Sequence, residues 1–162
     1  MYSFPHFGSF RRTLLYLISG NPGTFQPSMR RKDLTACLNC PAGEFCGQIA
    51  STRPTGKCSA GHFCPEGSAS ATKHVCPGGE YCPEGSGAPL PCQSKTFCPK
   101  GSATATACPE GSYCPLRSAK PIQCPAGTYC PASSGAPFVC PAGYVCPAGA
   151  TAPSACPAGK CS

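Results

Sequence analysis

The residues of this chain that could do chemistry are its cysteines, 17 of them in 162 residues. Cysteine at such density serves as a zinc ligand, as a reactive thiol or as half of a disulfide. From Cys40 onward the cysteines come in pairs six positions apart, such as Cys76 and Cys82, and the last pair is one residue shorter. Successive first cysteines follow at two steps of 18 residues and then five of 16. This regular spacing predicts a repeated disulfide framework of eight units.

The spacing leaves the pairing of these cysteines open. Three schemes fit the spacing. In the first, each unit closes on itself, as Cys76 with Cys82, and in the second, each second cysteine joins the first cysteine of the next unit, as Cys82 with Cys92. In the third, two units interlock, with a disulfide between their first cysteines and another between their second cysteines. The predicted disulfide cysteines are Cys40, Cys46, Cys58, Cys64, Cys76, Cys82, Cys92, Cys98, Cys108, Cys114, Cys124, Cys130, Cys140, Cys146, Cys156 and Cys161.

Every pairing scheme leaves one cysteine over. Cys37 precedes the framework and has no counterpart in later units, so it is the predicted unpaired cysteine. Three fates are open to Cys37: a disulfide to another chain, a bridge to a further N-terminal repeat, or competition with Cys40 for Cys46.

The cysteine spacing argues against zinc. Structural zinc sites use Cys-x2–4-Cys pairs, often with histidine. Only Cys37 with Cys40 and the shorter last pair, Cys156 with Cys161, fall within that spacing, and His6, His62 and His74 keep no fixed register with the cysteines. We therefore predict no metal and no other cofactor.

Catalysis is also disfavoured. A reactive thiol needs a nearby base, and His62 and His74 do lie near Cys64 and Cys76, but these cysteines belong to the repeat. The acids of the array occupy turn positions, as Glu66 does, and form no paired constellation. The sequence predicts that the protein is not an enzyme.

Composition indicates where such a chain functions. With 19 Gly, 21 Pro and no Trp, the chain lacks the large aliphatic side chains for a continuous core, so cross-links must replace burial. Disulfides persist in oxidising compartments, which predicts a secreted or extracellular cell-surface protein. Of the net charge of +7, residues 1–36 carry +4, and the charges of residues 37–162 are scattered singly through turns, so we expect no nucleic-acid binding. No apolar stretch reaches the ~18 residues of a membrane span.

Each unit has a common internal pattern. In six of the eight units it opens with Cys-Pro-x-Gly, where Pro is predicted at the first corner of a β-turn and Gly at its exit. A second turn follows most second cysteines, as at 64–67 and 82–85, and then a spacer of Ser, Ala, Thr and Pro. Because Pro recurs, we predict little or no helix; the fold class is a small disulfide-rich repeat array, an elongated rod of turns and short β-ribbons. An aromatic residue near each second cysteine is expected to cover a disulfide: Phe45, Phe63, Tyr81, Phe97, Tyr113, Tyr129 and Tyr144.

The domain boundary is predicted at residue 37, with repeats over 37–162 and a leader over 1–36. The leader contains no cysteine, and a short apolar run over 13–18 follows Arg11 and Arg12. That order is typical of a secretory signal peptide, and the alternative is a disordered leader.

Residues 37–162 resemble tandem ephrin-receptor-like cysteine-rich repeats, a module related to the cysteine-rich modules of tumour necrosis factor receptors. The signature Cys-Pro-x-Gly-x-Tyr/Phe-Cys-Pro is matched at 76–83 and at 124–131. The resemblance implies extracellular stalks, surface coats or matrix proteins, and its receptor modules favour the interlocked pairing. No kinase, ligand-binding domain or membrane span accompanies the repeats here.

We therefore expect a structural or spacer protein of a surface coat, stalk or matrix; the alternative is a receptor-type module that binds proteins or glycans. The expected partners are other extracellular proteins or glycans, with self-association through Cys37. The spacers at 68–72, 102–106 and 151–154 resemble O-glycan acceptors, which predicts a glycoprotein; the alternative is that their small residues only keep the spacers flexible.

Overall fold

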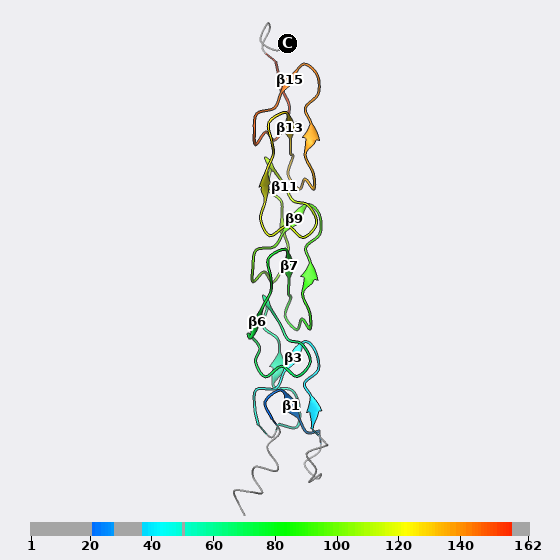
Figure 1. Ribbon diagram of the computed structural model, residues 1–162, viewed down its shortest axis with the longest axis vertical. Coiled ribbons are helices and arrows are strands. Elements are labelled where there is room, and N and C mark those ends of the chain that lie inside the picture. Colours follow the sequence, from blue (N-terminus) through cyan, green and yellow to red (C-terminus); the bar gives the residue numbers. More distant parts are fainter. Residues whose placement is uncertain (1–20, 28–36, 50, 157–162) are drawn as a thin grey trace, which may run out of the picture. The chain divides into compact units, whose positions relative to one another are not determined.

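The computed structural model describes residues 21–27, 37–49 and 51–156, and within these ranges it contains sixteen two-residue strands and no helix. The strands pair consecutively into eight two-stranded sheets (Figure 1). This confirms the predicted fold class of turns and short ribbons for the described residues. The sheets are β1 (Thr24–Phe25) with β2 (Leu38–Asn39), β3 (Glu44–Phe45) with β4 (Gly56–Lys57), β5 (His62–Phe63) with β6 (His74–Val75), β7 (Glu80–Tyr81) with β8 (Leu90–Pro91), β9 (Thr96–Phe97) with β10 (Thr106–Ala107), β11 (Ser112–Tyr113) with β12 (Ile122–Gln123), β13 (Thr128–Tyr129) with β14 (Phe138–Val139), and β15 (Tyr144–Val145) with β16 (Ser154–Ala155).

The first turn of each unit sets the entry to its hairpin. In the unit that begins at Cys40, the Glu44 N–H donates to the Pro41 carbonyl (3.1 Å), and Gly43 has φ = 90°. Pro therefore occupies the first position of the turn, and Gly the third, which requires positive φ. The predicted turn register was wrong by one residue, because the fixed φ of Pro is compatible with either of two turn positions, whereas only Gly adopts the left-handed corner freely.

The second turn repeats this design and adds a side-chain hydrogen bond. In the unit that ends in β10, the Ser102 N–H donates to the Pro99 carbonyl at 3.1 Å, and the Ser102 hydroxyl donates to the same oxygen at 2.7 Å. Gly101 supplies the positive φ of 81° between them. The serine that follows this turn thus has a structural role.

Consecutive units are joined by backbone hydrogen bonds. The first-turn glycine exchanges two bonds with the cysteines of the next unit, and two further bonds link the disulfide segment of one unit to the second turn of the next. For the unit that begins at Cys76 the four are Gly79 N–H to Cys98 O (2.8 Å), Cys92 N–H to Gly79 O (3.0 Å), Cys82 N–H to Ser102 O (2.9 Å) and Gly101 N–H to Cys76 O (2.8 Å). Because no side chain takes part, units of varied sequence stack in the same way.

The described chain falls into two compact parts, named unit 1 and unit 2. Each of these parts contains several repeat units, which are joined by the hydrogen bonds just described. Of the described residues, unit 1 comprises 21–27, 37–49, 51–59, 63–74 and 84–88, and unit 2 comprises 60–62, 75–83 and 89–156. In unit 2 the hairpins from β7–β8 to β15–β16 follow one another in chain order (Figure 1). The predicted elongated shape of the whole array stays a prediction.

The first hairpin lies partly in the segment predicted to be a leader. Strand β1 pairs with β2, with Phe25 opposite Leu38, and Gly23 has φ = 91° as in the cysteine-containing turns. Residues 21–27 are thus a repeat-type turn without its cysteines, so the repeated structure begins before residue 37. The apolar run over 13–18 lies outside the described residues, and the signal peptide stays a prediction.

Candidate functional site

Seven local disulfides form the chemical framework of the described chain. They close each unit on itself, with Cα–Cα distances from 5.7 to 6.1 Å: Cys40–Cys46, Cys58–Cys64, Cys76–Cys82, Cys92–Cys98, Cys108–Cys114, Cys124–Cys130 and Cys140–Cys146. The first of the three open schemes is therefore the one adopted. The interlocked pairing implied by the receptor resemblance is wrong, because the first turn of each unit brings its two cysteines within disulfide reach.

The remaining cysteines complete this picture. Cys37 is free and half-buried. Cys156 is disulfide-bonded, and Cys161 lies outside the described residues.

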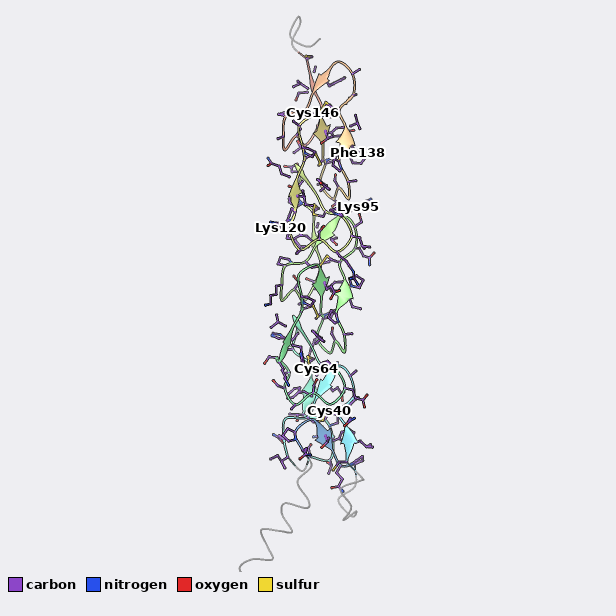
Figure 2. All side chains as sticks on the ribbon, in the orientation of Figure 1. Cys40, Cys64, Lys95, Lys120, Phe138 and Cys146 are labelled. Atoms are coloured by element: carbon purple, nitrogen blue, oxygen red, sulfur yellow. A yellow bond between two sulfur atoms is a disulfide. The ribbon has the colours of Figure 1, made fainter. Side chains whose placement is uncertain are left out.

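The cysteines are also the interior of the molecule. Twelve of them, from Cys40 to Cys130, are at most 2% exposed. Within the described ranges, Ala150 has the only buried apolar side chain that is not a cysteine. The aromatic residues beside the second cysteines are half-buried, and Tyr144 is exposed. Figure 2 shows Cys146 inside the chain and Phe138 projecting outward. Sulfur bridges therefore occupy the place that a hydrophobic core takes in other domains.

The two histidines of the array have other neighbours than the cysteines. The His62 Nδ1 lies 3.3 Å from the Ala60 carbonyl, and the His74 ring lies 5.3 Å from the Phe63 ring. Within the described ranges no three His, Cys, Asp or Glu side chains converge as metal ligands would.

First-turn glycines are packed against units two steps along the chain. A Cβ on Gly111 would lie 2.7 Å from the Gly149 carbonyl oxygen, and a Cβ on Gly79 would meet the Arg117 carbonyl oxygen. By contrast, no residue that the structure describes lies within 4 Å of a Cβ on Gly127. The positions of Gly79 and Gly111 therefore require glycine for two reasons: the positive φ of the turn, and the lack of space for a Cβ in the stacked array.

Three residues occupy glycine positions with positive φ although they carry side chains. Lys95 (φ = 76°) stands at a first turn, and Arg117 (φ = 62°) and Ser133 (φ = 57°) stand at second turns. A left-handed conformation costs a non-glycine residue about 1–2 kcal/mol. Sequence reasoning missed these positions, although the spacings Cys-x-x-Lys, Cys-Pro-x-Arg and Cys-Pro-x-Ser mark them.

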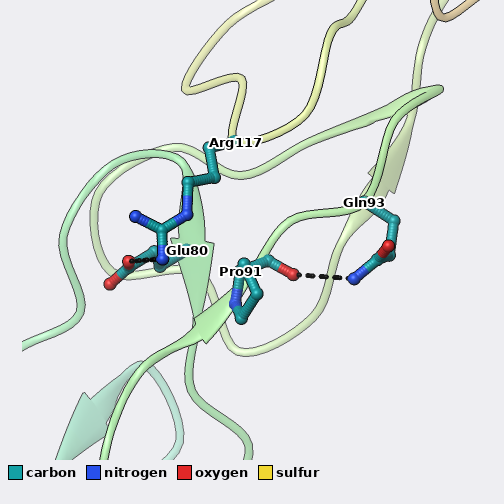
Figure 3. Close-up of polar contacts among 4 residues, drawn as sticks. All are labelled: Glu80, Pro91, Gln93 and Arg117. Carbon is teal, nitrogen blue, oxygen red and sulfur yellow. Dashed lines mark hydrogen bonds and ion pairs between the residues drawn. The ribbon is translucent and has the colours of Figure 1, made fainter.

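Charged side chains make few contacts with each other. Among the described residues Arg117 Nη2 and Glu80 Oε1 form an ion pair at 3.4 Å, drawn in Figure 3 beside the Gln93 bond to the Pro91 carbonyl. In unit 1, Glu44 lies opposite Lys57 across a hairpin. These two side chains line an open hollow of about 280 Å³.

The predicted O-glycan acceptors separate into two classes. The hydroxyls of Ser68 and Ser102 donate to proline carbonyls at 2.6 and 2.7 Å, so they are engaged. Thr72, Thr104 and Thr151 are exposed. The threonines, rather than those two serines, are the accessible candidates.

Large apolar side chains are exposed on several strands. They include Val75, Leu90, Ile122, Phe138, Val139, Tyr144 and Val145, with Val139 82% exposed. The Tyr129 and Phe138 rings stack at 5.6 Å across their hairpin. A single such side chain is ordinary, but their recurrence on the strands is a feature of this array.

No protein-family model and no curated protein matches this chain. The sequence and the structure together show an array of regularly spaced, disulfide-bonded β-hairpin repeats. Among the described residues no helix is long and apolar enough to cross a membrane. The disulfides indicate an oxidising compartment.

Proposed function

We propose that this protein is an extracellular structural spacer, a component of a surface coat, stalk or matrix, without enzymatic activity. The observation that carries the proposal is the backbone-to-backbone stacking of disulfide-closed units, in which Gly, Pro and Cys provide the contacts. Such a design extends by addition of further units without new side-chain complementarity. The resemblance to ephrin-receptor-like repeats supports an extracellular location, secreted or at the cell surface.

The stacked arrangement also accounts for the proposed resistance of the spacer to reduction and proteolysis. The six bridges from Cys40–Cys46 to Cys124–Cys130 are buried, so reductants and proteases reach them only after local opening. Each bridge closes a short loop and limits the unfolded chain. The stability of the protein then comes from disulfides and backbone hydrogen bonds. Such stabilisation suits a structural role better than a catalytic one. Glycans on the exposed threonines would add to this protection, and the protein is proposed to be a glycoprotein on that ground.

Small-angle scattering of the oxidised protein tests the spacer role. A compact globule of this length has a radius of gyration of about 15 Å. We expect a much larger value and a rod-type profile with a constant thin cross-section. Reduction in denaturant should abolish the rod profile. A compact oxidised particle would refute the spacer role.

A receptor-type module that binds proteins or glycans is the second candidate. The exposed apolar side chains on β12, β14 and β15 favour it, since such residues supply interface anchors. Self-association through the free Cys37 is a further proposal, which intact-mass analysis without reductant tests by the presence of a disulfide-linked dimer.

A further inference from the structure

One stretch of unit 2 departs from the repeat pattern toward positive charge. The x position of the second turn is Glu66 and Glu84 in two units but Lys100 in the next. Arg117 replaces the glycine of the following second turn, and Lys120 comes three residues later. The array therefore changes the sign of its charge between neighbouring units while its backbone scheme stays the same.

Stacking brings these three cations to one corner. A Cβ on Gly78 would lie 3.0 Å from the Ala119 Cβ and 3.8 Å from the Lys100 backbone nitrogen, so the segments that carry Lys100 and Lys120 meet there. The Arg117 carbonyl packs on the adjacent Gly79. We call Lys100, Arg117 and Lys120 the basic corner.

The basic corner is exposed and has excess positive charge. Lys100 and Lys120 are exposed, and the Arg117 side chain is 62% exposed. The acid at the corner is Glu80, whose side chain is 20% exposed and paired with Arg117. Figure 3 shows that this pair engages one end of the guanidinium, which leaves N–H donors for another anion.

The backbone of Arg117 carries a cost that glycine would avoid. Its φ is 62°. The residues at the equivalent positions of other units are glycines, which have no Cβ, and their φ values lie between 77° and 81°: Gly67, Gly85, Gly101 and Gly149. Strain of this kind persists where the surrounding structure holds the backbone in place, and it is common at functional sites. Here the side chain adds a cation at the corner.

We propose that the basic corner binds an acidic polysaccharide, one that carries sulfate or carboxylate groups along its length. Long exposed cations without enclosing walls act as point charges, and a polymer that repeats its anionic groups gains from several such contacts at once. Gly78 and Ala119 at the centre of the corner offer no aromatic face on which a nucleic-acid base could stack. This site goes beyond the spacer role and does not depend on it.

The test uses the full oxidised chain and heparin as the sulfated polysaccharide. Retention on immobilised heparin and titration with a size-defined heparin oligosaccharide are compared for Lys100→Glu, Arg117→Gly and Lys120→Gln. Lys100→Glu installs the residue of the sister units, and Arg117→Gly restores their glycine, so both keep the fold. Each neutralisation should weaken binding about three- to tenfold at physiological salt, and the charge reversal should weaken it more.

Lys95→Gly is the matched control. It also removes one positive charge and restores a glycine, but Figure 2 places Lys95 and Lys120 on opposite sides of the chain. We expect heparin affinity to change less than twofold in this variant. An equal loss in Lys95→Gly and Arg117→Gly would overturn the proposal in favour of unspecific net charge. So would absence of heparin binding at physiological salt, or binding of phosphatidylserine vesicles without heparin binding.

Discussion

The hairpins β1–β2 and β3–β4 share a geometry but not a disulfide. Gly23 N–H donates to Cys46 O at 2.9 Å, and Gly43 N–H donates to Cys64 O at the same distance. The turn before β3 is closed by Cys40–Cys46, whereas Gln26 stands at the second-cysteine position of the turn before β1. The same fold thus occurs with and without the clamp.

The comparison separates what specifies the repeat from what stabilises it. Positive φ at the turn glycine and the bonds between units are present in both hairpins. These features define the geometry, and the disulfide adds free energy by limiting the unfolded chain. A repeat unit can therefore lack its two cysteines and still stack on the next unit.

The largest expected effect comes from removing the clamp. The double substitution Cys40→Ala with Cys46→Ala should leave the stacking in place but lower the local free energy of unfolding by about 2–4 kcal/mol. Amide hydrogen exchange at Gly43 and Cys58 should then accelerate at least 30-fold, toward the rates of Gly23 and Cys40.

Cys37→Ser is the control for this experiment, because Cys37 is free and its loss should leave those exchange rates unchanged. Exchange that is unaffected by the double substitution would show that backbone stacking alone stabilises the hairpin.

A smaller effect tests the stacking itself. Gly111 and Gly127 have φ of 72° and 78°, so alanine suffers the same left-handed strain at both, about 1 kcal/mol. Only at Gly111 would the new Cβ meet a backbone oxygen, that of Gly149, at 2.7 Å. Gly111→Ala should therefore lower the free energy of unfolding by about 2 kcal/mol more than Gly127→Ala.

Denaturant unfolding of both alanine variants measures this difference. Equal losses would mean that the units do not pack two steps apart in solution, and that glycine is required only for its φ.

Cysteine spacing was sufficient to predict the fold class, because each pair forms within one turn and each turn recurs. The same reliance on cysteine hid the first hairpin, where Gly23, Thr24 and Phe25 match the pattern of Gly127, Thr128 and Tyr129 without flanking sulfur. Pairing could not be chosen from spacing, since several sulfur atoms become neighbours in any stacked array. The resemblance to receptor modules then favoured the wrong scheme.

The basic corner was beyond the reach of sequence reasoning for a different reason. Lys100 and Arg117 lie in neighbouring units, and their segments meet because the turn at Gly78 and Gly79 packs on Lys100 one unit along and on Arg117 two units along. Charge counted along the chain shows scattered cations. Only the stacking of turns on turns shows which of them share a surface.

The smallest effect concerns a unit that breaks the glycine rule. Lys95 has φ = 76° at a first turn and still makes both bonds to the next unit, Lys95 N–H to Cys114 O at 2.8 Å and Cys108 N–H to Lys95 O at 2.9 Å. Lys95→Gly should relieve the left-handed strain and raise the free energy of unfolding by about 0.5–1 kcal/mol, because the entropy of glycine in the unfolded chain offsets part of the gain. Denaturant midpoints measured beside Lys95→Ala, which keeps the strain and removes the charge, separate relief of strain from loss of charge. A gain in both variants would place the cost of Lys95 in its charge, and the geometry of the turn would then tolerate a side chain without penalty.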